Sequence, residues 1–360
     1  MSLGSWGAIV GNVLLFGLVV GLAATVEREA FVRSMKSRAL VVGAFAQFAF
    51  LPLVGFGCAK AFFADDPALG IPLIITTSSP GGSYSNWWTS LFNGDLSLSV
   101  AMTTVSSIAS VGFLPLNLYM YTEGAYPHEA KIKVKWAGLF VSIGVVIGAI
   151  VSGLFIGTRW PRSRKTLNVA GNMFGVLLVL LGFFFSSNSS APIWSRGWKF
   201  YIGLMIPCFA GMIVSLIWAR ILQLERPQAL AVAIEVVYQN TAIALAVILS
   251  SFSNDTSCTN VASNDCDVVG IAAGVPTFYQ LIQILSLGVL CVTSWRLGWT
   301  YAPVGTPLLK ALATNFQPST HVEYRQDQID QSTSAQDLEL ARSGQGVEMS
   351  ADVREHVAPA

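Results

Sequence analysis

The sequence predicts an all-α polytopic membrane protein with about nine transmembrane helices. Its mean hydropathy is +0.59 and 53% of its residues are hydrophobic, while only 11% are charged. A soluble domain carries about 25% charged residues. Two apolar runs far apart in the chain are interrupted by helix-breaking or polar residues. Because lipid cannot hydrogen-bond an opened backbone, these interruptions should face protein or a cavity, as at the central site of a secondary transporter.

The apolar runs define the spans in order along the chain. Pro80-Gly81-Gly82 interrupts the third span and Glu235 the eighth, so these two are the weakest as continuous helices. The chain then turns polar, so we expect a transmembrane transporter domain at 1–302 and a disordered, acidic cytosolic tail at 303–360. The predicted spans lie near residues 6–25, 40–62, 69–93, 97–121, 134–157, 167–187, 198–221, 227–250 and 271–298.

The distribution of Lys and Arg predicts an N-terminus outside and a cytosolic C-terminus, because basic residues are more frequent in the loops that this orientation places inside. Two glycosylation sequons, at Asn188 and Asn254, then fall in outer loops. Cys258 and Cys266 share the second of these loops and would form a short disulfide if oxidised. No Arg- and Ser-rich transit peptide is evident, so we expect a multi-pass protein of the plasma membrane.

Enzymatic motifs are missing from the sequence. It has no P-loop, Cys-x-x-Cys or His-Glu-x-x-His pattern, and none of its three histidines lies in a predicted span. The net charge of +1 gives no indication of nucleic-acid binding. We therefore predict a protein that is not an enzyme and has no cofactor apart from a coupling ion.

Glycines recur at the small-x-x-x-small spacing that lets helices approach closely. Such pairs fit either a homodimer face or close packing within one bundle, and packing within the bundle is the favoured interpretation. The pairs are Gly17/Gly21, Gly144/Gly148, Gly153/Gly157 and Gly171/Gly175.

Glu235 is the main candidate for a functional side chain. An ionised carboxylate at the centre of a membrane costs at least about 2.5 kcal/mol. The spans contain almost no Lys or Arg away from their ends, so a bound cation is a better partner than a basic side chain. Gln239, four residues on, shares a helix face with Glu235, and Asn240 adds another amide oxygen.

Ser85, Asn86, Ser99 and Thr103 extend this set with hydroxyl and amide oxygens. Oxygen ligands suit a hard cation, and a single carboxylate among neutral oxygens favours a monovalent ion over calcium. The alternative is that each Ser or Thr bonds back into its own helix, which stays open for any single residue.

The Pro80-Gly81-Gly82 break should also expose the N-terminus of a half-helix near Ser83, and such an end attracts anions. A cation bound nearby would raise the affinity for the anion, and the anion would raise that for the cation. The sequence therefore predicts sodium-coupled uptake of an anion.

The polar motifs resemble those of the bile acid:sodium symporter family over roughly residues 8–300. The similar runs are Ala46-Gln47-Phe48 with Leu51-Pro52-Leu53, Ser79-Pro-Gly-Gly-Ser-Tyr-Ser-Asn86, Asn93-Gly-Asp-Leu-Ser-Leu-Ser99, Met102-Thr-Thr104, and Glu235 with Gln239-Asn240. The resemblance implies an animal-type nine-span fold with a panel domain and a core domain, built from inverted repeats with two broken, crossing helices.

The resemblance also implies roles for individual residues. Asn240 and the amides around Ser83 would face the substrate. A first sodium site would use Ser85, Asn86, Ser99, Thr103 and Glu235, and a second would use Gln47, Glu235, Gln239 and the backbone near Val236 and Tyr238.

The chain departs from the family pattern at Val237 and Tyr238, where many relatives have Gly at the first of these positions, and at Ser78-Ser79, where relatives have paired Cys. Both changes spare the expected sodium ligands but alter the cavity beside the crossing, so the substrate stays open among bile acids, steroid conjugates and small carboxylates.

We predict a sodium-coupled symporter of an organic anion that works by alternating access, with sodium ions, the anion and membrane lipids as its partners. Two alternatives remain: a proton-coupled or uncoupled organic-anion carrier, and a receptor or scaffold of the same fold that transports nothing.

Overall fold

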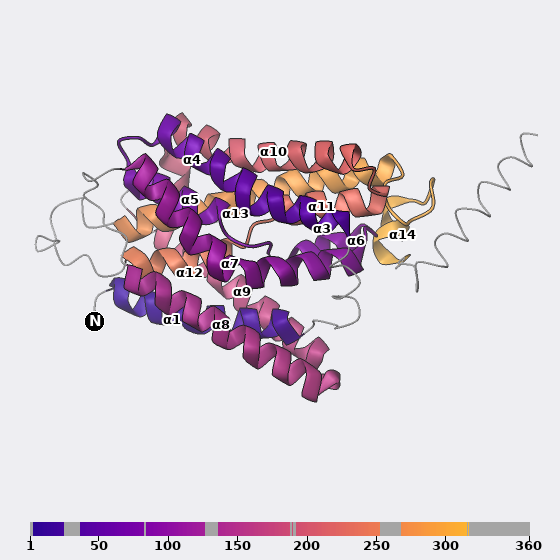
Figure 1. The fold of residues 1–360 in the computed structure, drawn as a ribbon, viewed down its shortest axis with the longest axis horizontal. Helices are drawn as coiled ribbons and strands as arrows, with labels where there is room; N and C mark the ends of the chain where they lie inside the picture. Colours follow the sequence, from indigo (N-terminus) through magenta and orange to yellow (C-terminus); the bar gives the residue numbers. More distant parts are fainter. Residues whose placement is uncertain are drawn as a thin grey trace, which may run out of the picture. The chain divides into compact units, whose positions relative to one another are not determined.

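Helices make up nearly all of the regular structure in the computed structural model (Figure 1). It describes residues 3–24, 37–82, 84–126, 136–187, 189, 192–252, 268–314 and 316. Within these ranges the only β-type pairing is an isolated bridge between Gly81 and Gln239. The predicted all-α fold class is confirmed.

Seven helical segments in the described ranges are long and apolar enough to cross a membrane. The two interrupted spans are instead built from pairs of shorter helices. The long segments are α1 (Leu3–Ala24), the continuous run of α3 (Arg38–Phe45), the π-helical turn η1 (Ala46–Phe50) and α4 (Leu51–Phe62), then α7 (Leu96–Ala125), α8 (Trp136–Arg159), α9 (Arg164–Ser187), α10 (Trp198–Ile221) and α13 (Val268–Arg296). The pairs are α5 (Pro67–Thr77) with α6 (Tyr84–Leu91), and α11 (Arg226–Val237) with α12 (Thr241–Phe252).

Large apolar side chains are exposed on several long helices, as a membrane protein requires. Examples are Phe140, Val151 and Phe155 on α8 and Leu285 and Val289 on α13. These side chains have no polar cover, so lipid is their natural surrounding. The chain is a multi-pass membrane protein.

The π-helical turn η1 has a local cause in the sequence. Pro52 lies at the start of α4 and has no N–H to donate to the carbonyl of Phe48, four residues earlier. Asn117 of α7 replaces that donor, since its Nδ2 lies 3.0 Å from the Phe48 oxygen. The turn also carries the buried Gln47.

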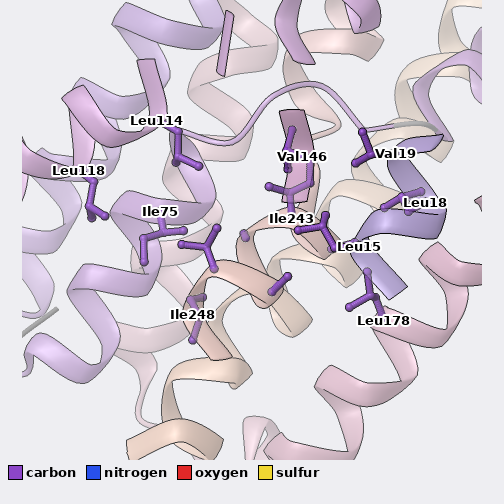
Figure 2. Packing of buried hydrophobic residues seen from close by; sticks show 14 of the residues in the cluster. Leu15, Leu18, Val19, Ile75, Leu114, Leu118, Val146, Leu178, Ile243 and Ile248 are labelled. Atoms are coloured by element: carbon purple, nitrogen blue, oxygen red, sulfur yellow. The ribbon is translucent and has the colours of Figure 1, made fainter. Parts of the chain in front are cut away.

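The helix α1 packs between α8 and α9, and α12 contacts all three of these helices. Figure 2 shows the buried cluster that joins them to α5 and α7, including Leu15, Val146, Leu178, Ile243 and Ile75. The helices α4, α5, α10, α11 and α13 contact one another around a second buried cluster.

Glycines explain how closely α1 approaches its neighbours. A Cβ at Gly21 would lie 2.6 Å from the Cα of Gly171 on α9, and one at Gly157 on α8 would lie 2.3 Å from the Ala24 oxygen. The space beside Gly144 and Gly148 is open instead. Packing within the bundle therefore accounts for the pairs on α1, α9 and the second half of α8.

The described chain continues past residue 302, where the sequence analysis places the end of the transporter domain. The short helix α14 (Leu308–Ala313) contacts α6, and Ala311 within it is buried. Packed structure thus extends into the segment expected to be a disordered tail. The rest of that tail, residues 317–360, lies outside the described residues, as do Ser83, Asn188, Asn254, Cys258 and Cys266.

Asn93 holds this C-terminal segment against the end of α6. Its Nδ2 donates to the Ala311 oxygen at 2.7 Å, and its Oδ1 accepts from the Phe316 N–H at 2.8 Å. Its backbone carbonyl accepts from the Tyr301 N–H at 2.8 Å. Asn93 has φ = 54°, a left-handed conformation that Asn tolerates better than most residues.

We predict that Gly21→Ala lowers the thermal unfolding temperature in detergent. The added methyl would lie 2.5 Å from the Leu167 oxygen and 2.6 Å from the Gly171 Cα, and backbone atoms cannot move aside cheaply. The expected cost is about 1–3 kcal/mol. Gly148→Ala is the control, because its Cβ would meet nothing within 4 Å; equal unfolding temperatures for the two variants would contradict the packing.

We predict that Asn93→Gly releases the C-terminal segment, because glycine keeps the left-handed backbone but removes the side-chain hydrogen bonds. Losing these buried bonds should cost about 1–3 kcal/mol. The measurement is the rate of tryptic cleavage at Lys310, followed by mass spectrometry, which should rise. Ser90→Ala, at an exposed position of the same helix end, should leave that rate unchanged.

Candidate functional site

The two broken helices meet where their chains unwind. The Gly82 N–H donates to the Tyr238 oxygen, and the Asn240 N–H donates to the Pro80 oxygen, both at 2.8 Å. These bonds flank the antiparallel bridge between Gly81 and Gln239. The backbone groups that lack a helical partner at one break therefore form hydrogen bonds with those at the other break. A site away from water requires such pairing.

The carboxylate of Glu235 lies at this crossing, in the last turn of α11, with 0% exposure. Its Oε2 accepts from the Ser85 hydroxyl at 2.6 Å and from the Thr103 hydroxyl at 2.9 Å. Its Oε1 has no hydrogen-bond partner and lies against Gly81, where a Cβ would come within 1.9 Å. Glycine at position 81 thus makes room for the carboxylate.

Asn86 and Ser99 complete the cluster. The Ser99 hydroxyl donates to Asn86 Oδ1 at 2.8 Å, and Thr103 Oγ1 lies 3.3 Å from the same oxygen. Thr103 also lies 3.0 Å from the Ser99 carbonyl of its own helix, so its single proton is shared among several acceptors. Side chains from α6, α7 and α11 therefore converge, and the hydroxyls of Ser85 and Ser99 bond to other helices or to the crossing rather than to their own backbone.

The second predicted group is only partly assembled. Gln239 Nε2 donates to the Val236 oxygen at 2.8 Å, while Gln239 Oε1 has no partner. The carbonyl of Tyr238 is bonded to Gly82. Gln47 is buried on η1 with its Nε2 unpartnered, and no hydrogen bond joins it to Glu235 or Gln239 in the part of the chain that the structure describes.

Asn240 has a structural task at the crossing. Its Oδ1 accepts from the Ile243 N–H at 3.0 Å and so caps the N-terminus of α12. It also lines a narrow cavity beside the crossing. Ser83, predicted to act with it, lies outside the described residues.

Two side chains of α13 belong to the crossing and are absent from the predicted site. Gln283 Oε1 accepts from the Gln239 N–H at 3.1 Å, and Gln283 Nε2 lies 3.2 Å from the Gln239 oxygen. Gln280 lies one turn earlier and bonds to Gln283, Tyr238 and Thr241. The available signal was two glutamines three residues apart within an otherwise apolar span.

The electrostatics of the site are those of a buried acid surrounded by neutral dipoles. Across the described ranges no Lys, Arg or His forms an ion pair with Glu235. The same ranges contain no group of three or more His, Cys, Asp or Glu side chains that could hold a metal ion. One carboxylate with hydroxyl and amide oxygens can bind a hard monovalent cation.

Comparison with known proteins shows where the chain has relatives. Residues 12–190 match the Sodium Bile acid symporter family. The chain is 28% identical to the ileal sodium/bile acid cotransporter of Oryctolagus cuniculus over 244 residues, 67% of this chain and 70% of that protein. It is 26% identical to the sodium-dependent organic anion transporter of Rattus norvegicus over 249 residues, 67% of this chain and 65% of that protein. It is 31% identical to the P3 protein of Homo sapiens over 242 residues, 65% of this chain and 49% of that protein.

We predict that Gln283→Met destabilises the crossing, because the thioether cannot replace the amide that bonds to both backbone groups of Gln239. Each lost hydrogen bond should cost about 1 kcal/mol. The measurement is the unfolding temperature in detergent. Leu287→Met, one turn further on and fully buried, is the matched control and should change it little; a similar loss in both variants would argue against a special role for Gln283.

Proposed function

We propose that this chain belongs to the Sodium Bile acid symporter family, which matches residues 12–190, and that it is a sodium-coupled symporter of an organic anion that works by alternating access. Its relatives are named as sodium/bile acid cotransporters and sodium-dependent organic anion transporters. These are transporters, and the chain is accordingly not an enzyme. The proposal for this chain rests on its own residues at the crossing.

The observation that carries the proposal is the state of the Glu235 carboxylate. It is buried, one oxygen has no partner, and no basic side chain in the described ranges neutralises it. A buried carboxylate without a counter-ion is costly, and a bound cation removes most of that cost. Sodium is the cation that this oxygen set fits.

We assign the first sodium ion to Glu235 with Ser85, Asn86, Ser99 and Thr103. These groups already lie within hydrogen-bond distance of one another, so they need only small movements to turn their oxygens toward an ion. The second ion would use Glu235, the free Oε1 of Gln239, the carbonyls of Val236 and Tyr238, and Gln47. Each of these carbonyls has a second lone pair beyond its present hydrogen bond.

The anion would bind beside the same crossing. The half-helices α6 and α12 both begin there, and the N-terminus of a helix favours negative charge. Two sodium ions against one carboxylate would leave one positive charge, which an anionic substrate neutralises. Ion and anion would thus stabilise one another's binding.

Alternating access would move α1, α8 and α9 as a panel against the remaining helices as a core. One junction between these groups is polar: Asn12 Nδ2 donates to the Ser250 hydroxyl at 3.0 Å, and the Ser142 hydroxyl lies 3.1 Å from Asn12 Oδ1. Further along α1, a hollow lined by Val19, Thr104 and Leu154 separates α1 and α8 from α7. A tied junction at one end and a hollow at the other support opening toward one side at a time.

We place the transporter in the plasma membrane with the N-terminus outside and the C-terminus in the cytosol. The exposed arginines Arg159 and Arg162, at the turn from α8 to α9, then lie on the cytosolic side. The bias of basic residues toward that side supports this orientation.

We predict that Glu235→Gln and Glu235→Ala abolish sodium-dependent uptake of organic anions into proteoliposomes. Both remove the only charge in the ligand set, and the loss should exceed about tenfold, since a buried charged interaction is worth several kcal/mol. Glu123→Gln, at an exposed position near the end of α7, is the control and should transport normally.

The same assay separates the alternatives. Unchanged uptake in Glu235→Ala would contradict the sodium site. Uptake that persists when choline replaces sodium at fixed pH would indicate a proton-coupled or uncoupled carrier. No flux of any organic anion through the wild-type chain would favour a receptor or scaffold.

A further inference from the structure

The cavity beside the crossing is small. It lies between Leu18 of α1, Gly175 of α9, Gln280 of α13 and the crossing itself. Sites that hold drug-sized ligands usually measure about 300–1,000 Å³, and the space enclosed here is far smaller. A substrate can therefore enter only when the surrounding helices move apart, and a small anion requires the smaller movement.

Two tyrosine rings restrict the cavity. The Tyr238 ring covers Gly82, where a Cβ would lie 2.7 Å from Tyr238 Cδ1. The Tyr84 ring meets it edge-on, with centroids 6.2 Å apart and an interplanar angle of 70°. The Tyr84 hydroxyl donates to the Asn172 oxygen of α9 at 2.7 Å, which fixes that ring across the gap between α6 and α9. Both rings therefore narrow the space beside the opened backbone at Gly82.

The hydroxyl of Tyr238 is oriented by Gln280. Gln280 Oε1 accepts from the Thr241 hydroxyl and from Gln283 Nε2 at 2.8 Å, so its Nε2 faces Tyr238. That Nε2 donates to the Tyr238 hydroxyl oxygen at 2.6 Å. The hydroxyl oxygen thus accepts from Gln280 through one lone pair, and the hydroxyl proton stays available for another acceptor. Tyr238 is only 3% exposed, and a donor shielded from water binds an anionic oxygen strongly.

We propose that Tyr238 determines the substrate specificity of this transporter: its hydroxyl donates to an anionic oxygen of the substrate, and its ring, with that of Tyr84, keeps the site narrow and so favours small carboxylates or sulfonates over steroid-sized anions. The proposal rests on the proposed function, since it assumes that an organic anion is carried. It adds the class of anion and the residue that selects it.

The experiment measures sodium-driven uptake by the full chain in proteoliposomes. Pantoate, benzoate and isethionate serve as small anions, and taurocholate as the steroid-sized one. The wild-type chain should carry at least one small anion and should exclude taurocholate.

The variants Tyr238→Phe and Tyr238→Ala separate the hydroxyl from the ring. Tyr238→Phe should raise the KM for the small anion about tenfold or more with little change in kcat, because only the hydrogen bond to the anion is lost. Tyr238→Ala should also admit taurocholate.

Tyr279→Phe is the matched control, because it removes a fully buried hydroxyl from the neighbouring position on α13 and should leave the KM unchanged. A sodium-dependent rise in unfolding temperature shows that each variant is folded, since the carbonyl of residue 238 survives every substitution. This readout requires no substrate.

The outcomes distinguish the two proposals. Sodium-dependent uptake of taurocholate by the wild-type chain, or a KM in Tyr238→Phe within about twofold of the wild-type value, would overturn the role of Tyr238 while leaving the proposed symport intact. Sodium-dependent uptake of none of the four anions would overturn both.

Discussion

Burying one carboxylate without a basic partner is the constraint on which the centre of this molecule depends. Glu235 sits at the end of α11 in a fully buried position. Ser85 and Thr103 provide donors to one oxygen, and Gly81 provides room for the other. Ser85, Thr103 and Glu235 belong to α6, α7 and α11, so the carboxylate holds these three helices in register. The same shortage of positive charge makes the site receptive to a cation.

The crossing of the broken helices links this acid to the rest of the bundle. Its backbone groups pair with each other, and Gln283 of α13 bonds to the backbone of Gln239 at the same point. Gly82 is bonded to Tyr238, whose ring faces the cavity. An ion at Glu235 and an anion in the cavity would therefore act on one short stretch of backbone. A coupling between the two binding events needs no long pathway here.

The sequence alone predicts the membrane fold and names most of the side chains that the fold brings together around Glu235. Hydropathy identified the long helices, and the proline, glycines and glutamate inside apolar runs identified the two interrupted ones. A buried acid within a membrane needs polar neighbours, so Glu235 predicted a cluster of polar side chains around it. The candidates were Ser85, Asn86, Ser99 and Thr103. The cap at Asn240 and the π-helical turn before Pro52 also have causes within a few residues, although Asn117, which bonds to the Phe48 oxygen of that turn, lies far along the chain.

Which distant groups meet depends on how the helices pack. In the sequence, Gln280 and Gln283 are two polar residues in an apolar span, and the fold brings them to the crossing. Hydrogen-bond partners more than 40 positions apart leave no periodic pattern in a sequence. Asn93 likewise gave no sign that it binds residues 311–316, which turned part of an expected tail into packed structure. The size of the cavity depends on how Tyr84 and Tyr238 pack against each other. Composition and spacing indicate which residues are buried and which local geometry they adopt. Which side chains pair across the bundle depends on how the helices are packed.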